Sequence, residues 1–530
     1  MTETLKVLIA DPVHEDGRAL LAKSPKIRVD VATGLDEAGL IAKIPGYDAL
    51  IVRSKSQVTR SVIAAGTALK AVGRAGIGVD NIDVNAATER GIVVFNTPDA
   101  NATTTAELTL AHLMSLSRHL PRADLSVRSG DWTPTKFIGT ELAGKSIGVI
   151  GFGTIGRIVA QRCAALLMKV YAFDPFVTAE MMQQFCAEPL SLDELIANSD
   201  YITLHCPMTD KTRNLIDKSR IASMKSGVRI INCARGGLIE EAALVEGLKS
   251  RHIAGAALDV FVKEPPAGSA LLQLDNVVLT PHLGASTDEA QQAVSVKIAE
   301  AISKFLTTGE AETAVNLPRI SSEQIGLSRP YHGLARSLGQ LASALSGGPI
   351  TELVIRFYGR VSEFDPRPIS TEAIVGVLAS WHPDRVNRVN APLLAKSHGI
   401  ETRIAQSETS RDYVSLIEVA AVTKKGTTTV AGTLLGGRLP RLVRIDEYRV
   451  EATLEGHFLF TRHHDKPGVV GALGAILGRE NINIQRMHVG TDGDARDAIA
   501  LIAVSKSLPE NAMNEIRAMP QIIEALEFTL

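Results

Sequence analysis

The chain of 530 residues is too long for a single hydrophobic core and predicts roughly three or four domains. Its 45% of hydrophobic and 22% of charged residues are typical of a globular protein, and its formal net charge of −2 gives no general attraction for nucleic acid or an anionic membrane. No apolar run approaches the ~20 residues of a membrane span, and the N-terminus enters a strand-like run without a signal peptide, so we expect a cytoplasmic protein.

Short apolar runs alternate with helical patterns in the first part of the chain. KVLIAD, DALIVRS, LKAVGRAG and GIVVFNTP are rich in Val and Ile, as buried parallel strands are. The segments between them suit helices, so this part predicts a small doubly wound α/β unit. A long helical stretch, TTAELTLAHLMSLSRHLPRADLSVRSG, then leads into a second α/β domain.

The second domain has the strand candidates KSIGVIG, KVYAFDP, DYITLHCP, VRIINCA, GAALDVF and NVVLTP. Six strands with intervening helices match the dinucleotide-binding fold. After Ser286 a helical run extends to about Gly309 and would carry the chain back to the first unit. We therefore expect the dinucleotide domain to be inserted into the first domain.

The pattern changes from about Val315. Up to about Glu455 a helical part is mixed with alternating runs such as TELVIRFYG and VSLIEVAAVT, which indicates an α+β domain. The remaining residues follow the order strand, helix, strand, strand, helix, strand, which is the ferredoxin-like pattern.

The predicted fold class is therefore α/β, with two doubly wound Rossmann-like domains followed by an α+β domain and a ferredoxin-like domain. The predicted boundaries are 1–98 with 287–314 for the first domain, 99–286 for the inserted dinucleotide domain, 315–454 for the α+β domain and 455–530 for the last domain.

The cysteines form no pattern that indicates a metal site or a disulfide framework. Cys163, Cys186, Cys206 and Cys233 are widely spaced and include no CxxC pair. We expect them to be reduced thiols and expect no metal.

A glycine loop between a strand and a helix predicts a dinucleotide site. Gly151, Gly153 and Gly156 form GxGxxG, which permits a tight turn and close approach of a pyrophosphate to a helix N-terminus. Asp174 ends the next strand, where an acid binds the ribose hydroxyls and repels a 2′-phosphate. The loop therefore favours NAD over NADP, although a plain glycine turn with a surface aspartate is the alternative.

Three ionisable residues follow strand-like runs behind this loop. Arg235 suits a carboxylate and an adjacent carbonyl oxygen, His282 suits the transfer of a hydroxyl proton, and Glu264 suits the orientation of that imidazole. Taken singly, they are equally well a salt-bridged arginine, a structural histidine and a solvated glutamate. Together, behind a nicotinamide site, they predict hydride transfer at a carbon that bears oxygen.

Whole segments then resemble one known family. GFGTIGR, NCARGG, LDVF, KEPP and TPHLGAST, with RSKS, GRAGIGVDNID and NATTTAEL, are similar to the motifs of the D-2-hydroxyacid dehydrogenases, over residues 1–310. The resemblance implies that Arg235, Glu264 and His282 are the catalytic residues. It also implies that NAD is bound by Gly151, Gly153, Thr154, Ile155, Gly156, Asp174, Cys206, Cys233, Arg235, Asp259, His282, Gly284 and Ala285.

The first domain indicates the substrate. Arg53 and Arg74 end two parallel strands, where ligands bind in such sheets, and two arginines suit a dianionic phosphate. Two surface arginines are the alternative. RSKS and GRAGIGVDN resemble the branch of the family that oxidises 3-phosphoglycerate, which implies substrate contacts from Arg53, Ser54, Arg74, Gly76 and Asn101.

One arginine of some members of that branch is missing here. After Trp132 the segment reads DWTPTKF, so Lys136 is the available cation. Lys55 and Ser56 lie beside Arg53 and Ser54 in the sequence.

The tail resembles an ACT domain, an amino-acid-binding regulatory module, in the segment HHDKPGVVGALGAILGRENINI. The resemblance implies that His463, Asp465 and Asn483 bind L-serine at an interface between domains, with His463 the most variable of the three among relatives. A domain that only dimerises is the alternative.

The domain before the tail resembles the intervening domain of long-form enzymes. Its Arg438, Arg441 and Arg444 suit a second anion or, equally well, a solvated basic turn.

We therefore expect an NAD-dependent oxidation of 3-phospho-D-glycerate to 3-phosphooxypyruvate, the first step of L-serine biosynthesis, under feedback by L-serine. The family implies a homotetramer, with the helix around 103–120 as a dimer surface. One rival is another D-2-hydroxyacid dehydrogenase, such as a hydroxypyruvate or glyoxylate reductase. Others are a corepressor-like binding protein and an amino-acid sensor with a vestigial enzyme half.

Overall fold

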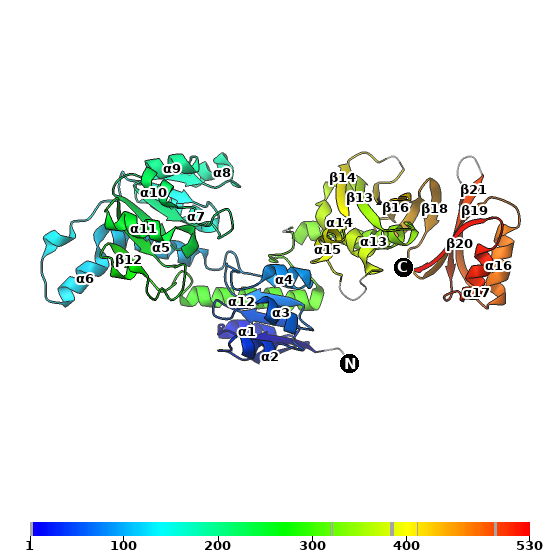
Figure 1. Ribbon diagram of the computed structural model, residues 1–530, viewed down its shortest axis with the longest axis horizontal. Coiled ribbons are helices and arrows are strands. Elements are labelled where there is room, and N and C mark those ends of the chain that lie inside the picture. Colours follow the sequence, from blue (N-terminus) through cyan, green and yellow to red (C-terminus); the bar gives the residue numbers. More distant parts are fainter. Residues whose placement is uncertain (1–3, 319, 321, 382–385, 411, 492–495) are drawn as a thin grey trace.

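The computed structural model describes residues 4–318, 320, 322–381, 386–410, 412–491 and 496–530. Its strands form four sheets in an elongated molecule, in which the first sheet lies between the second and the third and the fourth lies at the other end (Figure 1). Among the described residues, every helix is too short or too polar to span a membrane.

The first sheet is parallel, with the strand order β2-β1-β3-β4-β5. Its strands are β1 (Leu5–Ile9), β2 (Ile27–Val31), β3 (Ala49–Val52), β4 (Ala71–Arg74) and β5 (Val93–Phe95). The edge strand β2 has no counterpart among the predicted strands, because only Ile27 of it is buried. The other four strands agree with the prediction.

Helices cover both faces of this sheet. They are α1 (Glu15–Ala22), α2 (Glu37–Lys43), α3 (Arg60–Ala65), α4 (Val84–Glu89) and α12 (Asp288–Thr308). Helix α12 packs against α1 and β4, although it lies more than two hundred residues further along the chain. After it, Val315 N donates to Val94 O. The chain thus returns to the first sheet after the second sheet has been completed.

The second sheet is also parallel, in the order β8-β7-β6-β9-β10-β11-β12. Its strands are β6 (Ser146–Ile150), β7 (Lys169–Phe173), β8 (Glu188–Pro189), β9 (Tyr201–Leu204), β10 (Val228–Asn232), β11 (Ile253–Leu258) and β12 (Val277–Leu279). The order in which β6 neighbours both β7 and β9 is that of a dinucleotide-binding sheet. The predicted Rossmann-like fold class is confirmed.

The helices of this part are α5 (Ala102–Arg118), α6 (Leu120–Arg128), α7 (Thr154–Ala165), α8 (Ala179–Gln184), α9 (Leu192–Asn198), α10 (Lys218–Ser223) and α11 (Glu241–Lys249). The long helical stretch predicted before the second sheet is divided into two helices. His119 between α5 and α6 has the left-handed φ of 54°, and Pro121 follows in the first turn of α6. Pro121 has no N–H with which to continue the hydrogen bonds of α5 but is tolerated in a first helical turn, so the chain breaks and α6 leaves as a separate arm.

The third sheet has the order β14-β13-β15-β16-β17-β18. Its strands are β13 (Ile350–Gly359), β14 (Glu401–Ser407), β15 (Ser415–Thr423), β16 (Gly426–Leu435), β17 (Leu439–Ile445) and β18 (Tyr448–Ala452). The helices are α13 (Ser322–Leu345), α14 (Pro366–Ala379) and α15 (Ala391–Ser397).

The fourth sheet is antiparallel, with the order β20-β21-β19-β22. Its elements follow the chain as β19 (His457–His464), α16 (Val469–Arg479), β20 (Ile484–Thr491), β21 (Asp497–Val504), α17 (Glu510–Arg517) and β22 (Ile522–Thr529). The predicted ferredoxin-like order is confirmed.

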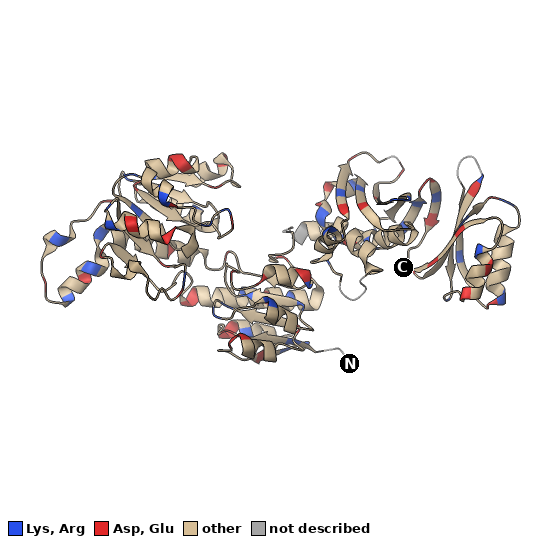
Figure 2. Ribbon diagram, viewed as in Figure 1, with Lys and Arg blue, Asp and Glu red and all other residues tan. Residues whose placement is uncertain are grey.

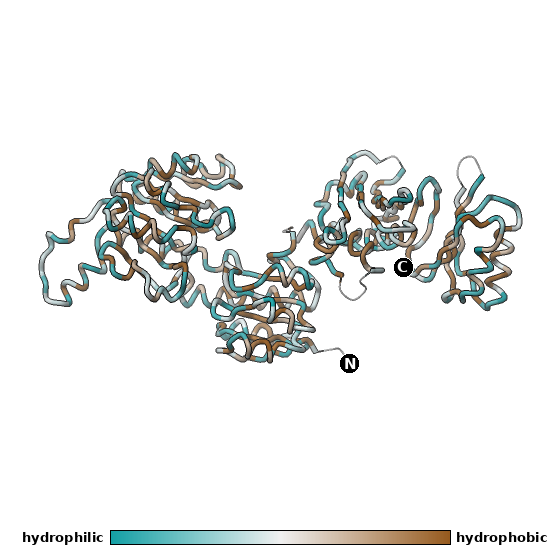
Figure 3. The backbone as a smooth tube through the Cα atoms, viewed as in Figure 1, coloured by the Kyte–Doolittle hydropathy of each residue, from teal (hydrophilic) through white to brown (hydrophobic). Residues whose placement is uncertain are grey.

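One hydrophobic core joins the third and fourth sheets (Figure 3). Phe458 and Phe460 on one face of β19 pack in the same cluster as Tyr448 and Val450 of β18. Leu459, between them in the sequence, packs instead against α16 and α17. This alternation is that of a strand buried on both faces, and it fastens the last two sheets together.

Candidate active site

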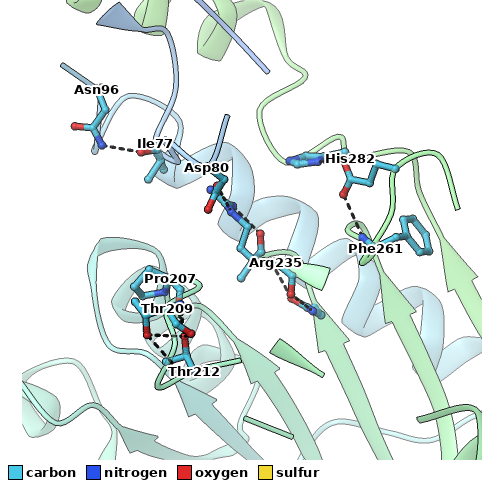
Figure 4. Close-up of polar contacts among 12 residues, drawn as sticks. Ile77, Asp80, Asn96, Pro207, Thr209, Thr212, Arg235, Phe261 and His282 are labelled. Carbon is cyan, nitrogen blue, oxygen red and sulfur yellow. Dashed lines mark hydrogen bonds and ion pairs between the residues drawn. The ribbon is translucent and has the colours of Figure 1, made fainter. Parts of the chain in front are cut away.

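The predicted hydride-transfer residues lie beyond the carboxyl ends of neighbouring strands in the second sheet (Figure 4). Arg235 follows β10, Glu264 follows β11 and His282 follows β12. Parallel strands end at the same edge of a sheet, which brings together side chains from distant parts of the sequence.

His282 and Glu264 form a hydrogen-bonded pair. His282 Nδ1 lies 2.7 Å from Glu264 Oε2, and Phe261 N donates to Glu264 Oε1 at 3.1 Å. Burial raises the pKa of Glu264, but the hydrogen bond and charge of His282, the Phe261 amide and the charge of Arg235 together lower it below its usual value. The carboxylate is therefore ionised at neutral pH, and it fixes Nδ1 while leaving Nε2 for a ligand.

The backbone of His282 is held in an unusual conformation. Its φ of 58° lies in the left-handed region, which is uncommon for a residue other than glycine. Asp259 stabilises this turn, because its carboxylate accepts from Leu283 N at 2.7 Å, Gly284 N at 2.9 Å and Thr280 Oγ1 at 2.6 Å. Asp259 is 0% exposed, so in this chain it orients the His282 loop from inside the protein.

Arg235 reaches from the second sheet toward the first. Its Nε donates to Asp80 Oδ2 at 2.7 Å, and its Nη1 donates to Ala234 O at 2.7 Å. Asn232 Nδ2 donates to Arg235 O at 2.8 Å and fixes the backbone of the turn. The guanidinium therefore stands at the junction of the two sheets.

The two arginines predicted to bind phosphate lie at the facing edge of the first sheet. Burial, together with the charge of Arg235, lowers the pKa of Arg74 to about 10, although the charge of Asp80 acts in the opposite direction. Burial also lowers the pKa of Arg53, opposed by the charge of Asp11. Both guanidiniums are still cations at neutral pH, and each gains from an anion that would offset the cost of its burial.

The carboxylate of Asp11 stabilises the loop after β3 by accepting hydrogen bonds from it. Its Oδ2 accepts from Arg53 N at 2.6 Å and its Oδ1 accepts from Ser56 Oγ at 2.9 Å. Ser56 is thus a buried structural residue, whereas Ser54 and Lys55 are exposed. Asp11 was not predicted, although an acid directly after the first strand of a parallel sheet is a usable signal.

Two further predicted substrate residues are Gly76, in the loop after β4, and Asn101, which precedes α5. Gly76 has a φ of 149° and lies against the Arg74 guanidinium. Asn101 is 7% exposed, and its Oδ1 has no partner among the described residues. Lys136 lies on the arm that follows α6 and pairs with Asp131 at 2.9 Å. The arm beside α6 that carries it lies apart from the first sheet within this chain (Figure 1).

The glycine loop has the shape that NAD requires. Gly151 has a φ of 93°, and a Cβ on Gly156 would overlap the carbonyl oxygen of Gly151. A Cβ on Gly153 would project into open space, where a pyrophosphate has room to approach the N-terminus of α7. Thr154 begins this helix, and Ile155 follows it.

Asp174 is oriented at the end of β7. Its Oδ2 accepts from Phe152 N at 2.8 Å and its Oδ1 from Phe176 N at 2.9 Å. The carboxylate retains lone pairs for the ribose hydroxyls of NAD. The residues of this loop therefore fit the dinucleotide.

The two cysteines of the predicted NAD site are protonated. Burial raises the pKa of Cys206 to about 11 and that of Cys233 to about 12. As neutral thiols they behave as small apolar side chains and not as nucleophiles. Among the described residues, no group of His, Cys, Asp and Glu side chains is placed to hold a metal ion.

The residues predicted to bind the effector, His463, Asp465 and Asn483, differ in their exposure to solvent. His463 is 2% exposed, and its Nδ1 lies 3.2 Å from Thr461 Oγ1. Burial lowers the pKa of His463, although Asp465 beside it acts in the opposite direction. Asp465 and Asn483 are exposed.

The three arginines predicted to bind a second anion, Arg438, Arg441 and Arg444, have different surroundings. Arg444 pairs with the buried Glu418 and lines a surface cavity with Asp446 and Arg462. Arg441 Nη1 donates to Pro440 O at 2.8 Å, and Arg438 is exposed.

Three family profiles match successive parts of the chain. The profile described as D-isomer specific 2-hydroxyacid dehydrogenase, NAD binding domain, matches residues 110–284. The D-3-phosphoglycerate dehydrogenase intervening domain matches 328–446, and the ACT domain matches 457–521.

Similar proteins extend over almost the whole chain. A D-3-phosphoglycerate dehydrogenase of Synechocystis sp. is 42% identical over 98% of this chain and 94% of its own length. Those of Archaeoglobus fulgidus and Bacillus subtilis are 41% and 38% identical, each over 98% of this chain and 99% and 98% of their own.

Solved structures match the first two sheets. A glyoxylate reductase from Paecilomyes thermophila has a TM-score of 0.56 at 30% identity, covering 59% of this chain and 99% of its own. A D-lactate dehydrogenase from Aquifex aeolicus, complexed with NAD and lactic acid, has a TM-score of 0.53 at 27% identity and covers 59% and 99%. The chain is an NAD-dependent oxidoreductase that belongs to the D-3-phosphoglycerate dehydrogenase family.

Proposed function

We propose that the chain oxidises 3-phospho-D-glycerate to 3-phosphooxypyruvate with NAD. The observation that carries the proposal is the convergence of two groups of residues on one junction. The His282–Glu264 pair and Arg235 stand at the end of the second sheet, and Arg53 and Arg74 stand at the end of the first. The names of the relatives that match the whole chain support the same substrate.

In the proposed reaction, Arg235 orients the substrate. A guanidinium binds a carboxylate and a neighbouring oxygen with parallel N–H groups, which suits a 2-hydroxy acid. Asn232 and Ala234 hold Arg235 in place from the backbone side.

His282 is the proposed general base. Because Glu264 accepts from its Nδ1, Nε2 is left to take the hydroxyl proton from C2. The ionised Glu264 stabilises the imidazolium that forms. NAD, when bound, accepts the hydride from C2.

Arg53 and Arg74 are proposed to hold the phosphate. Their burial beside Arg235 leaves a positive region at the end of the first sheet, which a dianionic group neutralises. An unphosphorylated hydroxy acid lacks that interaction.

The direct test is the formation of NADH from 3-phosphoglycerate and NAD by the purified chain. Turnover of 3-phosphoglycerate well above that of D-glycerate supports the proposal. Turnover of glyoxylate or hydroxypyruvate with NADH, without any activity toward 3-phosphoglycerate, favours the reductase alternative. A protein that binds NAD and turns over none of these acids favours the corepressor alternative.

Feedback and assembly form the second part of the proposal. We infer that L-serine is the effector at the fourth sheet, through His463, Asp465 and Asn483, and that the protein acts in the cytoplasm. Inhibition of NADH formation by L-serine tests the effector, and its absence would leave the fourth sheet as a domain that only dimerises.

Homo-oligomerisation is supported by the arm that follows α5. Helix α6 has no buried residue, and Leu125, Trp132 and Ile138 are 68%, 81% and 80% exposed. Lys and Arg residues are spaced along the same arm (Figure 2). Such apolar side chains on a projecting segment are typical of a subunit interface. Light scattering tests the predicted tetramer.

A further inference from the structure

The glycine-rich loop after β4, with the sequence GRAGIGVDN, is built around two guanidinium groups. A Cβ on Gly76 would overlap Nη1 of Arg74, and a Cβ on Gly78 would overlap Nη2 of Arg235. The two glycines therefore leave the space in which the two arginines lie. One of these arginines comes from the first sheet and the other from the second.

The same loop carries the carboxylate that meets Arg235. Asp80 Oδ2 accepts from Arg235 Nε at 2.7 Å, from the opposite side of the cleft between the two sheets (Figure 4). The side chain of Asp80 is 57% exposed and that of Arg235 is 29% exposed. An ion pair this exposed to solvent contributes little to the stability of the fold. We therefore ask what the pair does for the geometry of the site.

The pair fixes the direction of the guanidinium. A guanidinium has five N–H groups in one plane, and Asp80 and Ala234 O engage Nε and Nη1. With those two edges held, Nη2 is directed across Gly78, at the junction between the arginines of the first sheet and the His282–Glu264 pair. A long, flexible side chain is thereby restricted to one orientation before the substrate arrives.

The pair also balances charge. Besides burial, the positive charges of Arg235 and Arg53 lower the pKa of Arg74, whereas the negative charges of Asp80 and Asp11 raise it. Without Asp80, three guanidiniums would approach one another with one fewer carboxylate to offset them.

We propose that Asp80 is a positioning residue that holds the substrate-binding face of Arg235 across the cleft. Because the two partners belong to different sheets, the carboxylate site is complete only when the sheets approach each other. Asp80 thus couples the approach of the first sheet to the assembly of the reaction centre. The inference rests on the proposed function, since it assigns to Arg235 the carboxylate of a hydroxy acid.

The experiment compares Asp80→Ala, Asp80→Asn and Gly78→Ala with the wild type in steady-state turnover of 3-phosphoglycerate with NAD. We expect Asp80→Ala to lower kcat/KM about a hundredfold, as a displacement of roughly 1 Å in a positioned group does. Asp80→Asn should lose less, because its amide oxygen still accepts from Nε. Gly78→Ala should lower kcat/KM as well, because the methyl group displaces Nη2.

Two further readouts separate positioning from general damage. The melting temperature and the dissociation constant of NADH, measured by fluorescence, should be those of the wild type in both Asp80 variants. Glu89→Gln is the matched control, since Glu89 forms an exposed pair with Arg60 in the same sheet unit. It should keep wild-type kcat/KM.

Wild-type kcat/KM in Asp80→Ala would overturn the inference, and so would a loss that is matched by a fall in melting temperature or in NADH affinity. If the wild type itself turned over no hydroxy acid, the proposed function would fail first and the role of Asp80 with it. An active wild type with an active Asp80→Ala variant would remove only the role of Asp80.

Discussion

The two halves of the molecule are joined in opposite ways. The first and second sheets meet through polar contacts, such as Arg235 with Asp80 and, from the segment that connects the sheets, Asp99 with Thr154. The third and fourth sheets share one hydrophobic core. Among the described residues, no core cluster combines strands of the first sheet with strands of the second.

The difference indicates which parts move relative to each other. Exposed polar contacts exchange readily with water, so the first two sheets are free to open for NAD and substrate and to close around them. A shared core resists such motion, because separating its halves would expose apolar surface. We therefore expect the last two sheets to respond to an effector as one body.

The largest expected effect is on the chemistry of the cleft. His282→Asn removes the general base and should lower kcat by up to about 10⁴-fold, since general bases contribute that range. The dissociation constant of NADH should stay near that of the wild type, because the glycine loop and Asp174 are untouched. Steady-state kinetics and fluorescence titration measure both, and unchanged turnover would contradict the assignment of His282.

The next effect tests the shared core. Phe460→Ala, in a side chain that is 1% exposed, should lower the free energy of unfolding by about 3–5 kcal/mol. It should also speed hydrogen exchange in β18 of the third sheet as well as in β19. Leu459→Ala is the control on the opposite face of the same strand and should leave β18 protected. Equal protection of β18 in the two variants would mean that the sheets are independent.

A smaller effect tests the phosphate subsite. Arg53→Ala should raise the KM for 3-phosphoglycerate about a hundredfold, which corresponds to the loss of one charge-assisted contact of about 2–3 kcal/mol. The KM for D-glycerate should change little. An equal rise in the KM for both substrates would show that Arg53 supports the fold of the loop and does not bind the phosphate.

The smallest effect is a pH dependence that arises in helix α13, which packs on the third sheet. His332 is 8% exposed, and burial, with the charge of Arg388, lowers its pKa to about 4. The folded chain therefore keeps this imidazole neutral, whereas the unfolded chain binds a proton below about pH 6.5. Stability from this group is complete above pH 6.5 and is lost as the pH falls toward 4, by at most about 1.4 kcal/mol per pH unit.

His332→Gln should flatten that part of the profile. Urea unfolding of both proteins at several pH values between 7 and 5 measures the difference. A variant with the slope of the wild type would show that other groups cause the loss.

Most of the architecture was predictable because its signals are local. The Val- and Ile-rich runs marked the buried strands, and the glycine loop marked the dinucleotide site. The break at His119 was missed because hydrophobic periodicity continues through it, and β2 was missed because an edge strand needs few apolar residues.

The proposed site was predictable in its members but not in its connections. Arg235, Glu264 and His282 follow strands, and their position in the sequence was sufficient to select them. Asp80 carries no such signal, since an exposed acid in a loop is usually solvated, and the partners of the buried Asp11 could not be named from its place after the first strand. Their roles depend on which strands are neighbours in space. The burial of His463 likewise depends on tertiary packing, since it lies on the face of β19 that carries Leu459 and that α16 and α17 cover.

The central claim is tested most directly by the ratio of kcat/KM for 3-phosphoglycerate to that for D-glycerate, with NAD and the wild-type chain. The two substrates differ only in the phosphate that Arg53 and Arg74 are proposed to bind. The account predicts a ratio of about a hundred or more, as expected for one lost charge-assisted contact. A ratio near one would contradict it, because the first sheet would then add nothing to the hydride-transfer residues of the second.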